Sequence, residues 1–181
     1  MRLISLPGPF FRIDTQPVGA WSWTPFTDPK YRFDSAAGAW RVRYAARSDE
    51  GAARERYRDS GSFIPADHAG HHLVTLTGRV RVLDLRNEAV LDALALDDQI
   101  STSRADPWFH AAHRLTDAVR GWWGNHIEGI AYRSRTTPET STNIAFFEQA
   151  PLHGTSVPLA QCSELLDRLI VARAFTVDFA Y

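Results

Sequence analysis

The sequence predicts an α+β protein with a single domain that spans residues 1–181. Segments that alternate apolar and polar residues are mixed with helical segments, without the strict strand–helix alternation of a doubly wound sheet. The 181 residues are most simply one domain, with a core large enough to fold alone. With 44% hydrophobic and 23% charged residues, the composition is that of a soluble globular protein.

Charge and cysteine content exclude several classes of protein. The formal charge of −1 gives no net field that would draw the protein to nucleic acid or to an anionic membrane. Cys162 is the one cysteine, so an internal disulfide and a cysteine-based zinc site are excluded. No apolar run reaches membrane-spanning length, and the N-terminus does not read as a signal peptide. We therefore expect a cytoplasmic protein.

The first elements follow from alternation and capping signals. Residues 10–13 are expected to form a strand, and 14–39, rich in Pro, Gly and aromatic residues, a long loop that packs on the core. In 40–46 apolar side chains, Tyr44 among them, alternate with arginines on the other face, which predicts a second strand. Ser48, followed by two acidic residues, is the expected N-cap of a helix that ends near residue 58.

Turn and capping signals divide the rest of the chain. A turn at Thr77 and Gly78 is expected to join two strands. Asn87 is the expected cap of a short helix, and Asp106 with Pro107 begins a longer one. The predicted elements are strands at 72–76 and 80–85, a helix at 88–94, a polar loop at 97–103, a helix at 108–122, strands at 127–132 and 144–147, a helix at 159–169 and a strand at 171–179.

A group of polar side chains follows the buried strand predicted at 127–132. Its members are Arg133, Ser134, Arg135, Thr136 and Thr137, and a loop with Pro138 comes next. Arginine and hydroxyl groups at a strand end suit an anionic, sugar-like ligand. The alternative is a strand that stops at the surface among solvated polar residues.

Tyr44 on a strand and Glu55 on the following helix form a second candidate pair. A partly buried carboxylate can stabilise a developing positive charge, such as an oxocarbenium ion on a sugar carbon. The alternative is that Glu55 pairs with a neighbouring arginine and is solvated. No metal site is predicted, because His110 and His113 have a suitable spacing but no obvious carboxylate or cysteine companion.

Several short pieces together resemble a known family. They are Phe11-Arg12-Ile13, Tyr31-Arg32-Phe33-Asp34, Arg43-Tyr44-Ala45-Ala46, Ala52-Ala53-Arg54-Glu55, Val82-Leu83-Asp84-Leu85, Gly129 to Arg135, and Asn143 to Phe147. In their order and spacing, these pieces resemble the RES domain, named for a shared Arg, Glu and Ser. The resemblance covers roughly residues 10–149.

The resemblance implies a fold, an activity and a partner. RES proteins resemble ADP-ribosyltransferases, with a split, mixed β-sheet, surrounding helices and a cleft for NAD. They are typically toxins of bacterial toxin–antitoxin pairs that degrade NAD+ by breaking the nicotinamide–ribose bond, with water or phosphate as acceptor. NAD+ is then the substrate, and no separate cofactor is implied. The implied partner is a cognate antitoxin with a helix-turn-helix domain, and a homodimer is left open.

The resemblance also implies site residues. Arg12 and Arg32 both match family arginines, either of which would hold pyrophosphate or ribose oxygens. Tyr44 would pack against the nicotinamide or its ribose. Glu55 would bind ribose hydroxyls and stabilise the oxocarbenium-like transition state. Ser134 would position the nicotinamide-side ribose.

Weaker candidates and other functions complete the set of expectations. Ser101, Thr102 and Asn143 are further NAD-binding candidates. The expected catalytic set is Arg32, Tyr44, Glu55 and Ser134. The alternatives to NAD+ cleavage are a mono-ADP-ribosyltransferase that modifies a protein, which shares the first half-reaction, and a non-catalytic module that binds a nucleotide or a partner.

Overall fold

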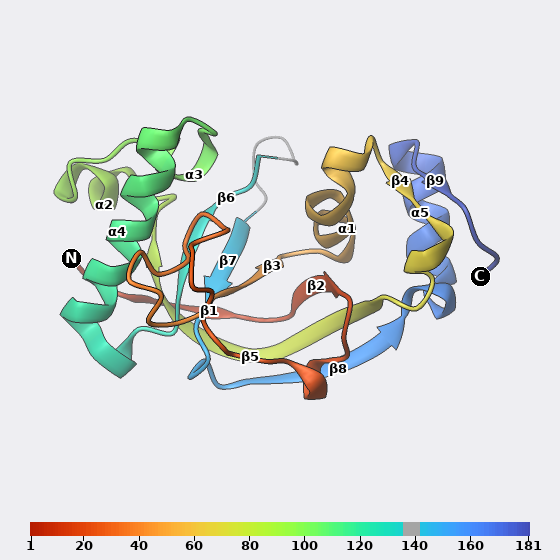
Figure 1. Ribbon diagram of the computed structural model, residues 1–181, viewed down its shortest axis with the longest axis horizontal. Helices are drawn as coiled ribbons and strands as arrows, with labels where there is room; N and C mark the ends of the chain where they lie inside the picture. Colours follow the sequence, from red (N-terminus) through yellow and green to blue (C-terminus); the bar gives the residue numbers. More distant parts are fainter. Residues whose placement is uncertain (136–141) are drawn as a thin grey trace. The chain divides into compact units, whose positions relative to one another are not determined.

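Helices are combined with mostly antiparallel strands, which confirms the predicted α+β class (Figure 1). The computed structural model describes residues 1–135 and 142–181, so Thr136, Thr137 and the loop with Pro138 lie outside the described residues. The chain forms two compact units, each from three separate stretches. Unit 1 consists of Met1–Pro7, Ser22–Tyr44 and Arg79–Pro151, and unit 2 of Gly8–Trp21, Ala45–Gly78 and Leu152–Tyr181.

The strands of unit 1 are ordered around the second half of β5 (His72–Asp84). β1 (Ile4–Pro7) pairs antiparallel with it, so that Leu6 lies opposite Val80. β6 (Gly129–Arg133) pairs with β5 in parallel, and β7 (Thr142–Phe146) pairs antiparallel with β6. Nearly every residue of β6 and β7 is buried, which is typical of strands covered on both faces, and the apolar ones are joined by the buried polar residues Thr142 and Asn143.

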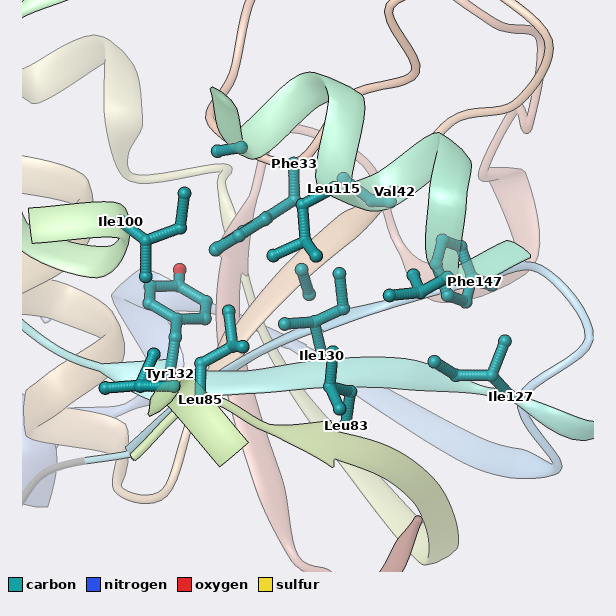
Figure 2. Packing of buried hydrophobic residues seen from close by; sticks show 14 residues of the cluster. Phe33, Val42, Leu83, Leu85, Ile100, Leu115, Ile127, Ile130, Tyr132 and Phe147 are labelled. Carbon is teal, nitrogen blue, oxygen red and sulfur yellow. The ribbon is translucent and has the colours of Figure 1, made fainter. Parts of the chain in front are cut away.

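Three helices of unit 1 cover these strands: α2 (Glu88–Ala93), α3 (Gln99–Thr102) and α4 (Asp106–Trp123). Figure 2 shows Leu115 of α4 pointing toward Ile130 and Leu83 on the strands, with Phe33 and Tyr132 beside them. The fully buried members of this core, each worth roughly 1.5–3 kcal/mol of apolar burial, include Phe33, Leu83, Leu85, Ile100, Ile127 and Ile130.

The strands of unit 2 are ordered around the first half of β5. β2 (Phe10–Asp14) pairs antiparallel on one side, and Phe11 of β2 lies opposite Ala46 of β3 (Arg43–Ala46). β8 (Leu152–Pro158) pairs antiparallel with the same half of β5, from His72 opposite Pro158 to Gly78 opposite Leu152.

Two helices and a small sheet complete unit 2. Figure 1 shows α1 (Asp49–Tyr57) next to α5 (Ser163–Arg173), and β4 (Phe63–Ile64) pairs in parallel with β9 (Thr176–Val177). A second core of buried residues, Tyr57, Ile64 and Leu166 among them, lies between these elements. The single-turn helices of the two units are Val18–Ala20, Arg58–Ser60, Ala66–His68, Gly124–His126 and Leu159–Gln161.

Several observed elements differ from the sequence prediction. The predicted turn at Thr77 and Gly78 is wrong, because β5 continues through it: Gly78 pairs with Leu152, and its carbonyl accepts from the Gly8 N–H at 2.7 Å. The predicted loop at 97–103 contains α3. The predicted final strand is reduced to β9, since α5 extends to Arg173. β1 and β8 had not been predicted.

The predicted helix caps agree with the structure better than the predicted polar face of the strand at 40–46. The hydroxyl of Ser48 accepts from the Gly51 N–H at 3.0 Å, which confirms the predicted N-cap of α1, and the side chain of Asn87 caps α2. Asp106 is the first residue of α4 rather than its cap. Arg43, expected on the polar face of its strand, is 4% exposed because its guanidinium donates to the Ser22 carbonyl. Among the described residues, none of the helices combines the length and apolarity of a membrane crossing.

Candidate active site

A tight turn in unit 1 begins at Tyr31 and ends at Asp34, with Arg32 and Phe33 between them. The Asp34 carboxylate accepts from the backbone N–H groups of Lys30 and Tyr31, both at 2.9 Å, and the Asp34 N–H donates to the Tyr31 carbonyl at 3.0 Å. Asp34 is 2% exposed, and its burial raises the pKa of the carboxyl group. The aspartate thus closes the turn from within the protein.

Tyr44 is held by this turn. Its hydroxyl oxygen accepts from the Phe33 N–H at 2.8 Å, and burial raises the pKa of the phenol well above its ordinary value. The residue as a whole is half-buried, with its ring against Tyr31 at 5.9 Å and Tyr132 at 6.3 Å between centroids. The hydroxyl is therefore anchored and neutral, while the ring retains some exposure.

Arg32 fastens the same turn to α3. Its guanidinium donates to the backbone carbonyls of Ile100, at 3.0 Å, and Ser103, and lies over the ring of Phe109. Arg32 is only 8% exposed. Arg32 thus positions the α3 segment. A direct contact between Arg32 and a phosphate group stays a prediction.

The α3 segment carries two of the weaker candidates. Ser101 is 1% exposed, and its hydroxyl has no hydrogen-bond partner among the described residues. The Thr102 hydroxyl donates to the Asp98 carbonyl at 3.0 Å within the helix, and the Thr102 carbonyl accepts from Arg135 at 3.3 Å. Thr102 is thereby linked to the residues that follow β6.

Ser134 and Asn143 lie at the ends of β6 and β7. Ser134 comes directly after β6 and is half-buried. Asn143 on β7 is 3% exposed and lies opposite Tyr132 in the strand register. Tyr132 in turn contacts Tyr44, so these candidates belong to one neighbourhood of unit 1.

Arg133, named among the polar residues after the predicted strand, and Arg86, which sequence reasoning missed, form an arginine cluster beside these strand ends. Arg133 pairs with Asp98 at 2.7 Å and donates to the Arg86 carbonyl at 3.2 Å. Arg86 binds both oxygens of Asp84, at 2.6 and 2.8 Å, and donates to the Thr142 hydroxyl at 2.5 Å. Arg86 follows Asp84 by two residues, but no local signal shows that its other partner is 56 residues away.

In unit 2, Arg12 and Glu55 lie on β2 and α1, which pack together. Arg12 Nε lies 2.6 Å from the Asp14 carboxylate on the same strand. Glu55 is half-buried and lies 3.4 Å from the Arg58 guanidinium, one of the pairings that the solvated alternative had named. At that distance on a partly exposed helix face, this pairing is weak.

The N-terminus of α1 is fixed by the neighbouring helix. Arg168 of α5 pairs with Asp49 at 2.5 Å and with Glu50 at 3.4 Å, and Arg173 pairs with Glu50 at 3.1 Å. Glu55 therefore projects from a helix that is capped by Ser48 and braced at its first turn.

His110 and His113 have a spacing that could suit a metal ion, but the described part of the structure does not place them in a metal site. His113 Nε2 lies 2.9 Å from the Tyr31 carbonyl, so it supports the turn. Among residues 1–135 and 142–181, no group of three or more His, Cys, Asp or Glu side chains is arranged to hold a metal ion.

Of the eight predicted site residues, Arg32, Tyr44, Ser101, Thr102, Ser134 and Asn143 lie in unit 1, and Arg12 and Glu55 in unit 2.

The RES domain matches residues 9–166, so the chain belongs to the RES domain family. The fold is also similar to that of a chain in the crystal structure of the M. tuberculosis MbcT–MbcA toxin–antitoxin complex. The two share 16% identity with a TM-score of 0.57, over 91% of each chain. No curated protein matches the sequence.

Proposed function

We propose that this protein is the toxin of a toxin–antitoxin pair and that it degrades NAD+ by cleaving the nicotinamide–ribose bond. The family membership supports this proposal, because NAD+ degradation is the activity that the RES resemblance implies. The observation that carries it is the anchoring of Tyr44 by the Phe33 N–H at 2.8 Å, beside the buried Arg32. This arrangement fixes an aromatic ring among the residues that the family pattern assigns to NAD.

The proposed reaction breaks the bond between C1′ of the ribose and N1 of the nicotinamide. The bonding electron pair leaves with the nicotinamide, which becomes neutral, and C1′ becomes an oxocarbenium-like centre. The Glu55 carboxylate stabilises that positive charge, an interaction that is stronger in the transition state than in the bound substrate. Tyr44 packs against the nicotinamide side of the substrate.

The acceptor then adds to C1′. Water forms the new C1′–O bond and releases a proton, which gives ADP-ribose. Inorganic phosphate gives ADP-ribose 1″-phosphate by the same addition. Ser134 is assigned to the ribose, and Arg12 and Arg32 to the phosphate and ribose oxygens or to the segments that carry them.

The proposed partner is a cognate antitoxin with a helix-turn-helix domain. The similarity in fold to a chain of a toxin–antitoxin complex supports this assignment. NAD+ serves as substrate, so the protein needs no resident cofactor, and the cytoplasm is where such a substrate is found. A homodimer remains a separate proposal that the oligomeric state in solution tests.

The proposed function is tested by following NAD+ in the presence of purified protein, with and without phosphate, and by separating the products. Nicotinamide with ADP-ribose is the result expected for hydrolysis, and nicotinamide with ADP-ribose 1″-phosphate for phosphorolysis. A labelled protein adduct instead of these products would replace the proposal with ADP-ribosyl transfer. Intact NAD+ with folded, partner-free protein would overturn it.

The role of Glu55 is tested in the same assay with Glu55→Gln, which keeps the size of the side chain and removes its charge. We expect turnover to fall at least about 100-fold, because the charge that stabilises the transition state is lost. Glu148→Gln, at an exposed position outside the site, is the matched control and should retain wild-type turnover. Equal NAD+ loss by both variants would overturn the site assignment.

A further inference from the structure

Tyr31 is an exposed aromatic residue held on a rigid backbone. Its side chain is 53% exposed, although the next two residues, Arg32 and Phe33, are buried. Its N–H donates to the Asp34 carboxylate at 2.9 Å, and its carbonyl lies 2.9 Å from His113 Nε2. Both polar groups of its backbone are thus fixed, so the ring is presented to solvent at little cost in conformational entropy.

The ring of Tyr31 lies against a predicted site residue. Its centroid is 5.9 Å from that of Tyr44, and the two planes meet at 63°. It also lies 5.8 Å from the ring of Phe26. Organic cations bind over the negative π face of such rings, and aromatic cages are built from several neighbouring rings of this kind.

The surrounding segment already binds cations through its rings. Arg41 lies 4.4 Å and Lys30 5.0 Å from the centroid of Phe26. Among the described residues, no cation lies over the ring of Tyr31, and no hydrogen bond reaches its hydroxyl. Tyr31 therefore offers a π surface that the protein's own cations do not use.

The position of Tyr31 separates it from the other exposed large apolar residues. Met1 and Tyr181 are chain ends, Trp122 lies at the end of α4, and the remaining ones are Phe63, Val157, Ile170 and Val171. Within the described part of the chain, Tyr31 is the one member of this set whose ring contacts a predicted site residue. Binding residues concentrate on connecting segments held by a rigid scaffold, and Tyr31 lies on such a segment beside a predicted site residue.

We infer that Tyr31 is a substrate-binding residue that recognises the positively charged pyridinium ring of NAD+ by a cation–π contact. The inference rests on the proposed function, in that NAD+ is the substrate. The charge of the pyridinium is lost when the glycosidic bond breaks, since the electron pair stays with nicotinamide. Tyr31 thus favours NAD+ over the uncharged dihydropyridine of NADH, and it releases neutral nicotinamide more readily than it holds the substrate.

The test uses 1-methylnicotinamide, a pyridinium cation without a ribose, so binding is read without turnover. Its affinity for the wild-type protein, measured by NMR titration, should exceed that of neutral nicotinamide. Tyr31→Leu, which keeps an apolar side chain but has no π system, should weaken binding of the cation about 3- to 30-fold, and Tyr31→Phe should retain it within about twofold. Tyr181→Leu, at another exposed tyrosine, is the control and should bind as the wild type does.

Two results would overturn the inference: equal binding of 1-methylnicotinamide by Tyr31→Leu and the wild type, or no preference of the wild type for the cation over nicotinamide. NAD+ kinetics provide the second readout, in which Tyr31→Leu should raise KM in the same range and change kcat by less than about threefold. Cation binding that depends on Tyr31 in a protein that leaves NAD+ intact would overturn the proposed function alone. NAD+ cleavage with unchanged cation binding in Tyr31→Leu would overturn the inference alone.

Discussion

The backbone N–H of Phe33 donates to the hydroxyl oxygen of Tyr44, eleven residues further along the chain, at 2.8 Å. This bond joins a turn to a strand and sets the direction of the Tyr44 ring. It also gives the backbone N–H of Phe33 an acceptor. Phe33 is fully buried, so this donor would otherwise be unpaired in the interior. Tyr44 is therefore a structural residue as well as a candidate for binding NAD+.

Tyr44→Phe should lower the free energy of unfolding by about 1–3 kcal/mol, because the Phe33 N–H is left buried without an acceptor. Urea denaturation measures this difference. Tyr181→Phe removes the bond between an exposed phenol and Asp167 and should leave stability close to that of the wild type. Equal losses in the two variants would contradict a special role for the Tyr44 hydroxyl.

Arg32→Lys should loosen α3, because an ammonium group cannot span the carbonyls of Ile100 and Ser103 as the guanidinium does. We expect a loss of about 1.5–3 kcal/mol in stability and faster amide hydrogen exchange in residues 99–103. Arg114→Lys, at an exposed position on α4, is the matched control. Unchanged exchange at 99–103 in Arg32→Lys would show that other contacts hold this segment.

Two glycines should respond to alanine in opposite directions. A Cβ at Gly129 would lie 2.7 Å from the Ala145 carbonyl oxygen, so Gly129→Ala should force β6 and β7 apart and destabilise the protein by about 1–3 kcal/mol. A Cβ at Gly121 of α4 meets no atom within 4 Å, so Gly121→Ala should stabilise the protein by about 0.5–1 kcal/mol. Thermal unfolding of both variants gives the two signs, and a shift in the same direction would refute this account.

Acid should destabilise the protein through His71. Burial lowers the pKa of this imidazole from 6.5 to about 4, and the His68 ring, stacked at 3.8 Å, and Arg56 act in the same direction, while Asp67 and Asp14 oppose them. Above pH 6.5 the group is neutral in both states and contributes no pH dependence. Between pH 6.5 and 4 the unfolded chain takes up a proton that the folded protein does not, so stability falls as the pH falls.

His71→Gln should remove up to about one proton from this pH dependence, because glutamine does not titrate. Unfolding free energies at several pH values between 7 and 4 give the slope for the variant and for the wild type. Identical slopes would mean that the loss of stability in acid comes from other groups.

The sequence predicted those elements whose signals are local. Ser48 and Asn87 cap their helices as expected, because a capping side chain acts on an N–H two or three residues away. The turn predicted at Gly78 was wrong, because this residue pairs with Leu152 and accepts from the Gly8 N–H. Both partners are distant in sequence. The edge strands β1 and β8 give no strong alternation, because β1 has only 4 residues and the less exposed face of β8 carries Leu152, Gly154, Ser156 and Pro158.

Sequence reasoning named candidate site residues but not the contacts that those residues make. Tyr44, Arg32 and Glu55 were named from family pieces, and the family is confirmed. No pattern showed that Arg32 would bind carbonyls 68 and 71 residues away, or that Asp34 would close a turn beneath it. Such contacts depend on tertiary packing, so their partners cannot be read from spacing along the chain. The assignment of each residue to NAD+ stays a prediction.

The two units are built from stretches that alternate along the chain, so that the backbone passes from one to the other five times. No single cut in the gene can therefore separate them, because every fragment would carry incomplete parts of both cores. Nor can either unit form before the last third of the polypeptide is available, since unit 1 needs Arg79–Pro151 and unit 2 needs Leu152–Tyr181. A ribosome would therefore have to release residues up to Pro151 before the core of unit 1 could close, and up to Tyr181 before the core of unit 2 could close.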